Sequence, residues 1–187
     1  AVNHSEKKIG ADELAAVTQL FTEDYMVLFL LHNTLGAWWT AKRKSAGQSD
    51  SLTGYEFTYL RKGADGTPAA GAFDGWPRAA KDLRFLDPSM GSGHFLVFAL
   101  PMLVAMRREE EGLTNAEACD AVLRENLYGM ELDTRCTQIA AFNLALAAWK
   151  LSGYRPLPPL NIACCGLGIH ACEDEWLKLT NGDKTLV

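Results

Sequence analysis

An acidic residue, a glycine-rich turn and the start of a helix follow one another between Asp87 and Phe95, and this stretch constrains the fold most. The apolar residues before it, 83–86, predict a short strand. Gly91 and Gly93 remove side chains, so a ligand can lie against the backbone there. The helix that begins near Gly93 would offer unpaired N–H groups to that ligand. The stretch therefore predicts a nucleotide-type pocket at the end of a strand.

The chain after residue 81 alternates between strand-like and helix-like patterns. Strands are predicted over 83–86, 127–131 and 161–165, and helices over 94–111, 114–125 and 134–151. This β-α-β-α-β order predicts an α/β protein with a parallel, doubly wound sheet, part of a Rossmann-like fold. In such a sheet the first strand lies beside the fourth, so the strand over 83–86 is expected to be an uncovered edge.

The chain before residue 81 differs in character. Residues 1–44 are predicted to be an N-terminal helical segment, with helices over 13–20 and 24–39. Residues 45–80 are rich in Gly, Ser, Asp and Pro and predict a loop or hairpin insertion, in which Tyr55 to Leu60 is one strand-like piece. The pocket then belongs to the third part, 81–187.

Two helices carry apolar residues at spacings of three and four, which predicts their buried faces. In the helix over 24–39 this stripe is Tyr25, Leu28, Phe29, His32, Leu35 and Trp39. In the helix over 134–151 it is Ile139, Phe142, Leu146 and Trp149. His32 is interpreted as a satisfied core residue, and the cluster Lys42, Arg43 and Lys44 as a solvated helix end rather than a DNA contact.

Composition excludes two broad classes. A net charge of −5 and a pI near 5.4 argue against a protein that binds nucleic acid mainly through its overall charge. The longest apolar run, Phe95 to Met106, is too short to span a bilayer, and a cytoplasmic protein is expected. Five scattered Cys residues favour reduced thiols, and Cys164, Cys165, His170 and Cys172 lack the spacing of a zinc site, so no metal is expected. The chain begins at Ala1 rather than Met, which favours a piece of a longer protein.

The glycine-rich turn lacks the residues that two common phosphate-binding motifs require, and this narrows the kind of nucleotide ligand. A phosphate-binding P-loop needs a Gly-Lys pair, and the chain has none. The dinucleotide fingerprint needs Gly or Ala three positions after Gly93, where Leu96 stands. Asp87, directly before the turn, would repel a pyrophosphate and suits a ligand with an ammonium group.

The full pattern Asp-Pro-x-x-Gly-Ser-Gly-x-Phe, from Asp87 to Phe95, resembles the S-adenosylmethionine-binding motif of the DNA methyltransferases that modify the exocyclic amino group of adenine. The resemblance implies S-adenosyl-L-methionine as the cofactor. The cofactor-binding residues that it implies in this motif are Asp87, Pro88, Ser89, Gly91, Gly93 and Phe95.

Two further segments resemble the same family. Leu127 to Asp133 is similar to its second motif, which implies that Glu131 accepts from the ribose hydroxyls and that Leu132 packs on the adenine ring. The segment around Phe21 and Thr22 resembles the family's Phe/Tyr-Thr-Pro segment near the methionine end of the cofactor, although Glu23 replaces the proline. Taken alone, both segments read as ordinary helix caps.

The subfamily resemblance is to the large adenine methylases of phage-exclusion systems of the BREX or Pgl type. It rests on the long helix before the first motif, on Asn33 to Gly36 and on Asn161 to Cys164. It covers about residues 18 to 168 apart from the 45–80 loop.

The family's catalytic signature, Asn/Asp-Pro-Pro-Tyr/Phe, is not found. The one Pro-Pro pair, Pro158 and Pro159, has Leu on both sides and is interpreted as a loop stiffener. No catalytic residue is therefore assigned, and the chain alone is expected to be inactive. The missing catalytic and target-recognition regions are expected on a longer parent protein or a partner chain, which would contact the DNA.

Three functions remain open from the sequence. The first is the cofactor-binding half of a DNA adenine-N6 methyltransferase of a restriction-modification or phage-defence system. The second is a non-catalytic cofactor-binding or assembly module in a defence complex. The third is a structural domain whose pocket is empty. The exposed edge of the sheet also makes self-association an expectation.

Overall fold

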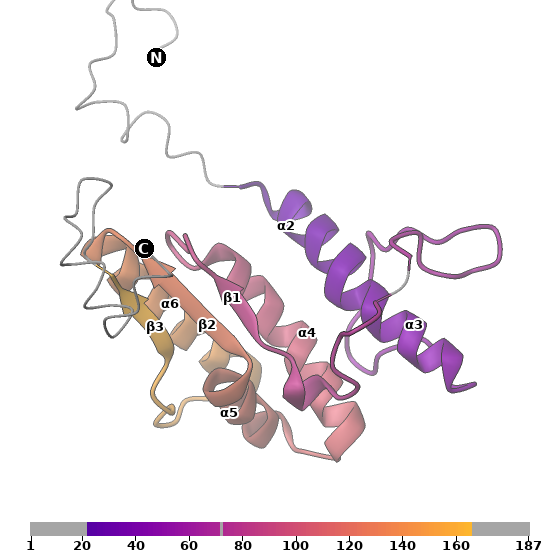
Figure 1. Ribbon diagram of the computed structural model, residues 1–187. Helices are drawn as coiled ribbons and strands as arrows, with labels where there is room; N and C mark the ends of the chain where they lie inside the picture. The colour runs from indigo at the N-terminus through magenta and orange to yellow at the C-terminus, as the bar shows by residue number, and fades with distance from the viewer. Residues whose placement is uncertain (1–21, 72, 166–187) are drawn as a thin grey trace, which may run out of the picture.

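The computed structural model describes residues 22–71 and 73–165 (Figure 1). A helical rod comes first, made of α2 (Asp24–Leu31), the π-helical turn η2 (His32–Gly36) and α3 (Ala37–Ser45). A long irregular segment then leads to the 3-10 turn η3 (Ala80–Asp82). The alternating part consists of β1 (Phe85–Asp87), α4 (His94–Glu111), α5 (Asn115–Glu125), β2 (Leu127–Glu131), α6 (Thr134–Ser152) and β3 (Asn161–Cys164).

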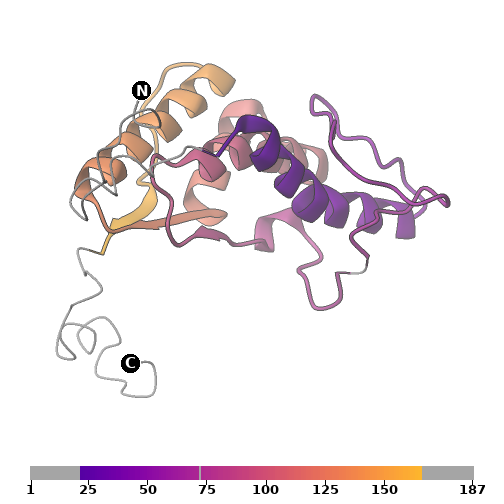
Figure 2. The same cartoon turned by 90° about the horizontal axis from the view of Figure 1, so that it is seen from above.

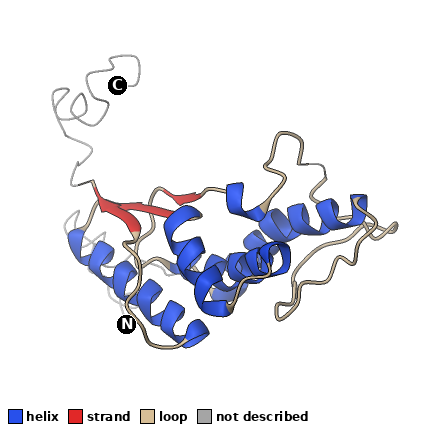
Figure 3. Cartoon of the chain, turned by 90° about the horizontal axis from the view of Figure 1, so that it is seen from below, coloured by secondary structure: helices blue, strands red, loops and turns tan. Residues whose placement is uncertain are grey.

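The three strands form one parallel sheet in the order β1-β2-β3. Phe85 is paired with Leu127, and Gly129 with Ile162. Helices α4, α5 and α6 all lie on one side of this sheet (Figures 2 and 3). The prediction of an α/β chain with a parallel sheet is confirmed. Within the described part, β1 is an edge strand, as expected.

The strand pattern of β2 explains which face is covered. Leu127 and Gly129 are buried, whereas Met130 keeps 37% of its surface exposed, since successive side chains point to opposite faces. A Cβ atom at Gly129 would lie 2.4 Å from Met90 Sδ and 2.9 Å from Leu96 Cδ1, so any other residue there would force these packed side chains to shift. On the other face Leu86 is 55% exposed.

Helix α6 turns a different face to the core than the sequence predicts. Its buried residues are Ala140, Leu144 and Ala148, whereas Ile139 and Phe142 are 49% and 61% exposed. The predicted stripe is wrong for these two residues, whereas Leu146 and Trp149 are partly buried, and the difference arises because α6 packs closely. A Cβ atom at Gly93 would lie 3.0 Å from the Cβ of Ala140, a separation that bulky residues at the contact would prevent.

The stripe predicted for the helix over 24–39 is also only partly right. His32, Leu35 and Trp39 are buried, but Tyr25 and Phe29 are exposed and their places in the core are taken by Val27, Leu31 and Trp38. Residues 27–31 are apolar on every side, so spacing alone leaves the rotation of the helix open. The π-helical turn then adds an extra residue to one turn and shifts the faces after it.

The predicted strand-like piece, Tyr55 to Leu60, is not a strand; the segment has only isolated antiparallel bridges, Leu52 with Tyr55 and Lys62 with Pro68. Side chains of η2 hold it instead. His32 Nδ1 accepts from the Tyr59 N–H at 3.1 Å, and the Asn33 amide bonds to the Tyr59 carbonyl and the Arg61 N–H. The interpretation of His32 as a satisfied core residue is confirmed.

Other predicted elements agree with the structure. Thr114 and Glu117 form the predicted capping box at the start of α5. The helix predicted over 13–20 lies outside the described residues. None of the helices in the described ranges is long and apolar enough to cross a membrane.

We expect the fold to lose stability as the pH falls below about 6.5, because of His32. Burial lowers the pKa of His32, and its Nδ1 already accepts a hydrogen bond, so the folded chain favours the neutral ring. The unfolded chain then binds more protons between the two pKa values, and unfolding becomes easier at acid pH. Urea unfolding at pH 7.5, 6.5 and 5.5 should show a steeper loss in the wild type than in His32→Gln. Equal losses in the two proteins would contradict this assignment.

Candidate functional site

The carboxyl ends of the three strands lie along one edge of the sheet, because the strands are parallel. Asp87 ends β1 and Glu131 ends β2. The glycine-rich turn connects β1 to α4 directly beside them, and Met90 N–H donates to the Met130 carbonyl at 2.9 Å. The two segments that carry the predicted site residues are therefore joined through their backbones.

The Glu131 carboxylate links the two loops at this edge. Its Oε2 accepts from the Gly91 N–H at 2.7 Å, across 40 residues of sequence. Its Oε1 accepts from the N–H groups of Leu132 at 2.7 Å and Asp133 at 3.1 Å. A carboxylate has about four acceptor positions, so Glu131 can take a further donor from a ligand. The observed bonds hold it in a single orientation for that contact.

The surroundings of Asp87 disfavour the charged form of its carboxyl group. Burial raises the pKa of Asp87, and the nearby negative charge of Glu131 adds to this rise, while a hydrogen bond from the Ser89 N–H at 3.2 Å opposes it. Neither Asp87 nor Glu131 takes part in an ion pair among the described residues. Two carboxylates without a cation suit a ligand that brings positive charge and hydrogen-bond donors.

We expect Asp87→Asn to stabilise the folded chain and to weaken its binding site. The raised pKa means that the Asp87 carboxylate costs folding free energy above its folded pKa, whereas asparagine keeps the acceptor for Ser89 N–H without the charge. Residues at binding sites commonly show this exchange of stability for function. Thermal unfolding at pH 7.5 should give a higher midpoint for Asp87→Asn than for the wild type, and the difference should vanish at acid pH. A lower midpoint at pH 7.5 would contradict the assignment.

The turn needs both of its glycines. Gly91 has φ +53° and Gly93 has φ +79°, a backbone region that other residues rarely adopt. A Cβ atom at Gly91 would meet nothing within 4 Å, so this side of the turn faces open space where a ligand can approach. The turn is held from behind, because Asn143 on α6 donates to the Ser92 carbonyl at 3.0 Å.

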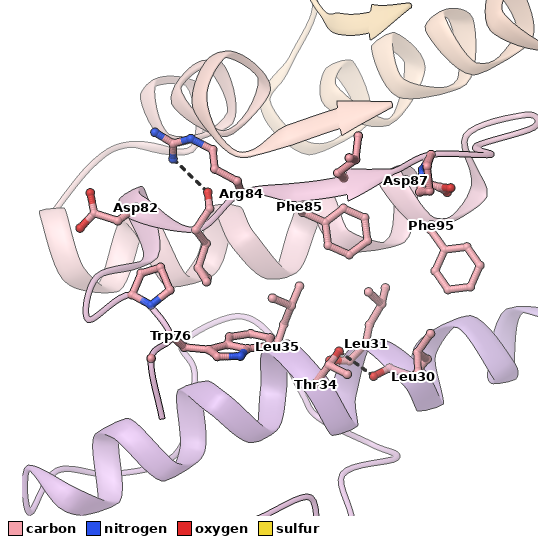
Figure 4. Close-up of a pocket in the computed structure, with 15 residues that line it drawn as sticks. Leu30, Leu31, Thr34, Leu35, Trp76, Asp82, Arg84, Phe85, Asp87 and Phe95 are labelled. Carbon is pink, nitrogen blue, oxygen red and sulfur yellow. Dashed lines mark hydrogen bonds between the residues drawn. The ribbon is translucent and has the colours of Figure 1, made fainter. Parts of the chain in front are cut away.

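A cavity of about 710 Å³ runs along the free edge of β1 (Figure 4). Apolar side chains of α2 and η2, among them Leu31 and Leu35, face Phe85 and Phe95 across it, and Trp76 closes one end. Asp87 lies at the opposite end from Trp76. Glu131 and the two glycines of the turn do not line this cavity, so it borders the predicted cofactor site at Asp87 and extends away from it.

The structure brings most of the predicted site residues together around these strand ends. Seven of them lie on the turn or at the end of β2: Asp87, Pro88, Ser89, Gly91, Gly93, Glu131 and Leu132. Phe95 lies on the first turn of α4 and lines the cavity. Thr22 is exposed just before α2, and Phe21 lies outside the described residues.

Sequence reasoning missed one contact next to the site. His94 Nε2 bonds to Asp24 Oδ1 at 2.9 Å, although the two residues are 70 positions apart. No spacing rule pairs residues at this separation. The one signal in the sequence was that Asp24 and His94 are each the first residue of a helix, next to a predicted cofactor motif.

The basic cluster at the end of α3 makes contacts within the protein. Lys42 pairs with Glu110 and Arg43 with Glu109, both on α4, and Lys44 donates to the Asp65 carbonyl at 2.7 Å. These partners fasten the helical rod to the rest of the fold. The interpretation of a solvated helix end is wrong for Lys42 and Arg43, which are partly buried, whereas Lys44 is exposed, and the contacts give the cluster a structural role that needs no DNA.

In the described ranges no three His, Cys, Asp or Glu residues stand close enough to hold a metal ion. Cys164 and Cys165 donate weak hydrogen bonds to the carbonyls of Leu132 and Glu131. His170 and Cys172, the other two residues considered as zinc ligands, lie outside the described residues.

Comparison with known proteins gives a consistent result. Residues 77–154 match the family described as MmeI, DNA-methyltransferase domain. The chain is 29% identical over 145 residues to the adenine-specific methyltransferase PglX of Lacticaseibacillus casei, covering 75% of this chain and 12% of that protein. It is 27% identical over 146 residues to the adenine-specific methyltransferase BrxX of Escherichia coli, covering 76% of this chain and 12% of that protein.

A shorter match concerns a putative type II restriction enzyme and methyltransferase of Methanocaldococcus jannaschii, 36% identical over 72 residues, which are 35% of this chain and 6% of that protein. The chain thus spans only about an eighth of the length of PglX and BrxX. The resemblance identified from the motifs, to adenine-specific methyltransferases of the BREX or Pgl type, is confirmed.

Proposed function

We propose that this chain, a methyltransferase segment homologous to PglX and BrxX, is the S-adenosylmethionine-binding portion of a larger DNA adenine-N6 methyltransferase. The parent protein would serve a restriction-modification or phage-defence system in the cytoplasm. In this proposal 1–44 is a helical segment, 45–80 an insertion and 81–187 the cofactor-binding part of a doubly wound, Rossmann-like domain.

The observation that carries the proposal is the pair of carboxylates, Asp87 and Glu131, at neighbouring strand ends around the glycine turn. They lack a cationic partner among the described ion pairs, and burial and mutual repulsion raise the pKa of Asp87. S-adenosylmethionine has an ammonium group, a positively charged sulfur and two ribose hydroxyls, which match these acceptors. A phosphate-bearing ligand would add a negative charge to the same place.

Each residue then has a binding role. Asp87 would accept from the ammonium group, and Glu131 would accept from the ribose hydroxyls with the carboxylate that the backbone already orients. Gly91 leaves the space in which the ligand lies. Leu132, 47% exposed beside Glu131, would pack on the adenine ring. The remaining binding residues in this proposal are Phe21, Thr22, Pro88, Ser89, Gly93 and Phe95.

When bound, the cofactor would supply a methyl group on a positively charged sulfur; transfer to an aligned adenine amino nitrogen would break the carbon–sulfur bond, leave a neutral thioether and release a proton from the nitrogen. The contribution of this chain is to hold and orient the donor. The acceptor that would align the target nitrogen is expected elsewhere. Leu157 and Leu160, which flank the Pro158–Pro159 pair, pack on the core, so this pair has a structural role.

The free edge of β1 is where the catalytic part is expected to attach. A fourth strand of a doubly wound sheet would lie beside β1, next to the strand end that carries Asp87. The cavity along this edge is mostly apolar and is bounded by the rod, which suits an inserted apolar strand and its loop. Methyl transfer by the parent protein would take place at the Asp87 end of this cavity.

The test is methyl transfer by the protein that the complete gene encodes. With S-adenosylmethionine labelled in its methyl group and bacterial DNA lacking methylation, we expect label in N6-methyladenine, and much less with Glu131→Ala at the same cofactor concentration. The 187-residue chain alone should transfer no label. Cofactor binding by the complete protein without any transfer would favour the alternative, a non-catalytic binding or assembly module.

A further inference from the structure

We propose that the hydrogen bond between His94 and Asp24 is a clasp that positions the start of α2 over the cofactor turn. The inference rests on the proposed function, because its consequence is tighter binding of S-adenosylmethionine. His94 and Asp24 are positioning residues in this view. They act through the segment that contains Thr22, and neither touches the ligand.

The geometry joins two helix starts. Asp24 is the first residue of α2, and His94 is the first residue of α4, directly after Gly93 of the turn. His94 Nε2 lies 2.9 Å from Asp24 Oδ1. The imidazole also stacks on Phe98, one helical turn later, with the ring centroids 5.1 Å apart and the planes 11° from parallel. This stacking holds the ring so that Nε2 points to Asp24.

The start of α2 has little else to hold it. Thr22, Tyr25 and Met26 are exposed, and Val27 is the first buried residue of the helix. Over 22–26, the clasp is the one hydrogen bond to another element that the described residues make. Thr22 is two positions before Asp24, and Gly93 is next to His94, so the clasp ties the predicted methionine-end segment to the turn.

A structural role alone would predict a different outcome. The Asp24 side chain is 73% exposed, and exposed pairs of this kind contribute little to folding stability. If the pair is only an exposed surface contact, its loss should change neither stability nor affinity to a measurable extent. If it positions the α2 start, its loss should leave the unfolding midpoint unchanged and weaken ligand binding.

The experiment compares His94→Ala, Asp24→Ala and the double variant by calorimetric titration with S-adenosylmethionine and by thermal unfolding. We expect each single variant to raise the Kd about 3- to 10-fold, the double variant to be no weaker than either single one, and all midpoints to stay near that of the wild type. Asp24→Asn keeps an acceptor for Nε2–H and should bind almost normally. The matched control is Asp50→Ala, which removes an exposed ion pair with Lys62 away from the site.

A second readout separates this inference from the proposed function. Hydrogen exchange of the amides of residues 26–28, without ligand, should be faster in His94→Ala than in the wild type. If the wild type binds no S-adenosylmethionine, the proposed function fails while faster exchange still supports the clasp. If the wild type binds and both alanine variants bind equally well, or if exchange is unchanged, the clasp is refuted.

Discussion

Glu131→Ala is expected to weaken the binding of S-adenosylmethionine by about 100-fold or more. In the proposed complex this carboxylate accepts from two ribose hydroxyls, and each hydrogen bond to a charged group contributes about 1.5–3 kcal/mol. Losing even one of them fully gives a change of about tenfold to a hundredfold, and losing both gives more. The variant also loses the link to the Gly91 N–H, so the turn is less well held. Calorimetric titration measures the change.

Two comparisons control for indirect effects of this change. Glu131→Gln keeps the shape but turns an amide donor toward the backbone N–H groups of Gly91 or Leu132, so it should bind weakly as well. Glu56→Ala alters an exposed glutamate on the irregular segment and should bind like the wild type. Wild-type affinity in a folded Glu131→Ala protein would contradict the assigned role.

Asn126→Ala should lower the free energy of unfolding by about 2–4 kcal/mol. Asn126 is fully buried just before β2, and its amide donates to the carbonyls of Ala80 at 2.9 Å and Leu83 at 2.8 Å. Its oxygen accepts from Arg107, itself only 4% exposed. Alanine removes three hydrogen bonds from a buried site, and each contributes about 0.5–1.5 kcal/mol, although each of the three partners keeps one other hydrogen bond. Urea unfolding measures the loss.

The chain offers a matched control for this prediction. Asn161 makes the same kind of contact, donating to the carbonyls of Leu123 and Arg124 at 3.1 and 2.8 Å, but it is only partly buried. Water can replace its amide, so Asn161→Ala should lose less than about 1 kcal/mol. Equal losses for the two variants would show that burial does not set the cost and would contradict the account of Asn126.

The predictable part of the fold is local in sequence. The turn from Asp87 to Gly93 could be predicted because consecutive residues determine it. The capping box of Thr114 and Glu117 could be predicted because its two residues always stand three positions apart. The parallel order of the strands followed from their alternation with helices. The approach of Asp87 and Glu131 then followed from parallel geometry.

The unpredicted part depends on contacts between distant segments. The rotation of α6 is decided by the close approach of Ala140 to Gly93, which its own apolar pattern does not encode. Residues 55–60 have the composition of a strand but are held by His32 and Asn33, from a π-helical turn that spacing rules do not anticipate. The clasp of His94 with Asp24 belongs to the same class of contact.

The most direct test of the central claim is to locate S-adenosylmethionine on the chain by amide NMR. Assigned spectra of the wild type would be recorded during titration with this cofactor and, separately, with ATP. We predict saturable shifts for S-adenosylmethionine, largest at the amides of Gly91, Gly93 and Leu132, and none at these positions with ATP. A folded chain whose strand-end amides do not move, or move equally with both ligands, would contradict the proposed cofactor site.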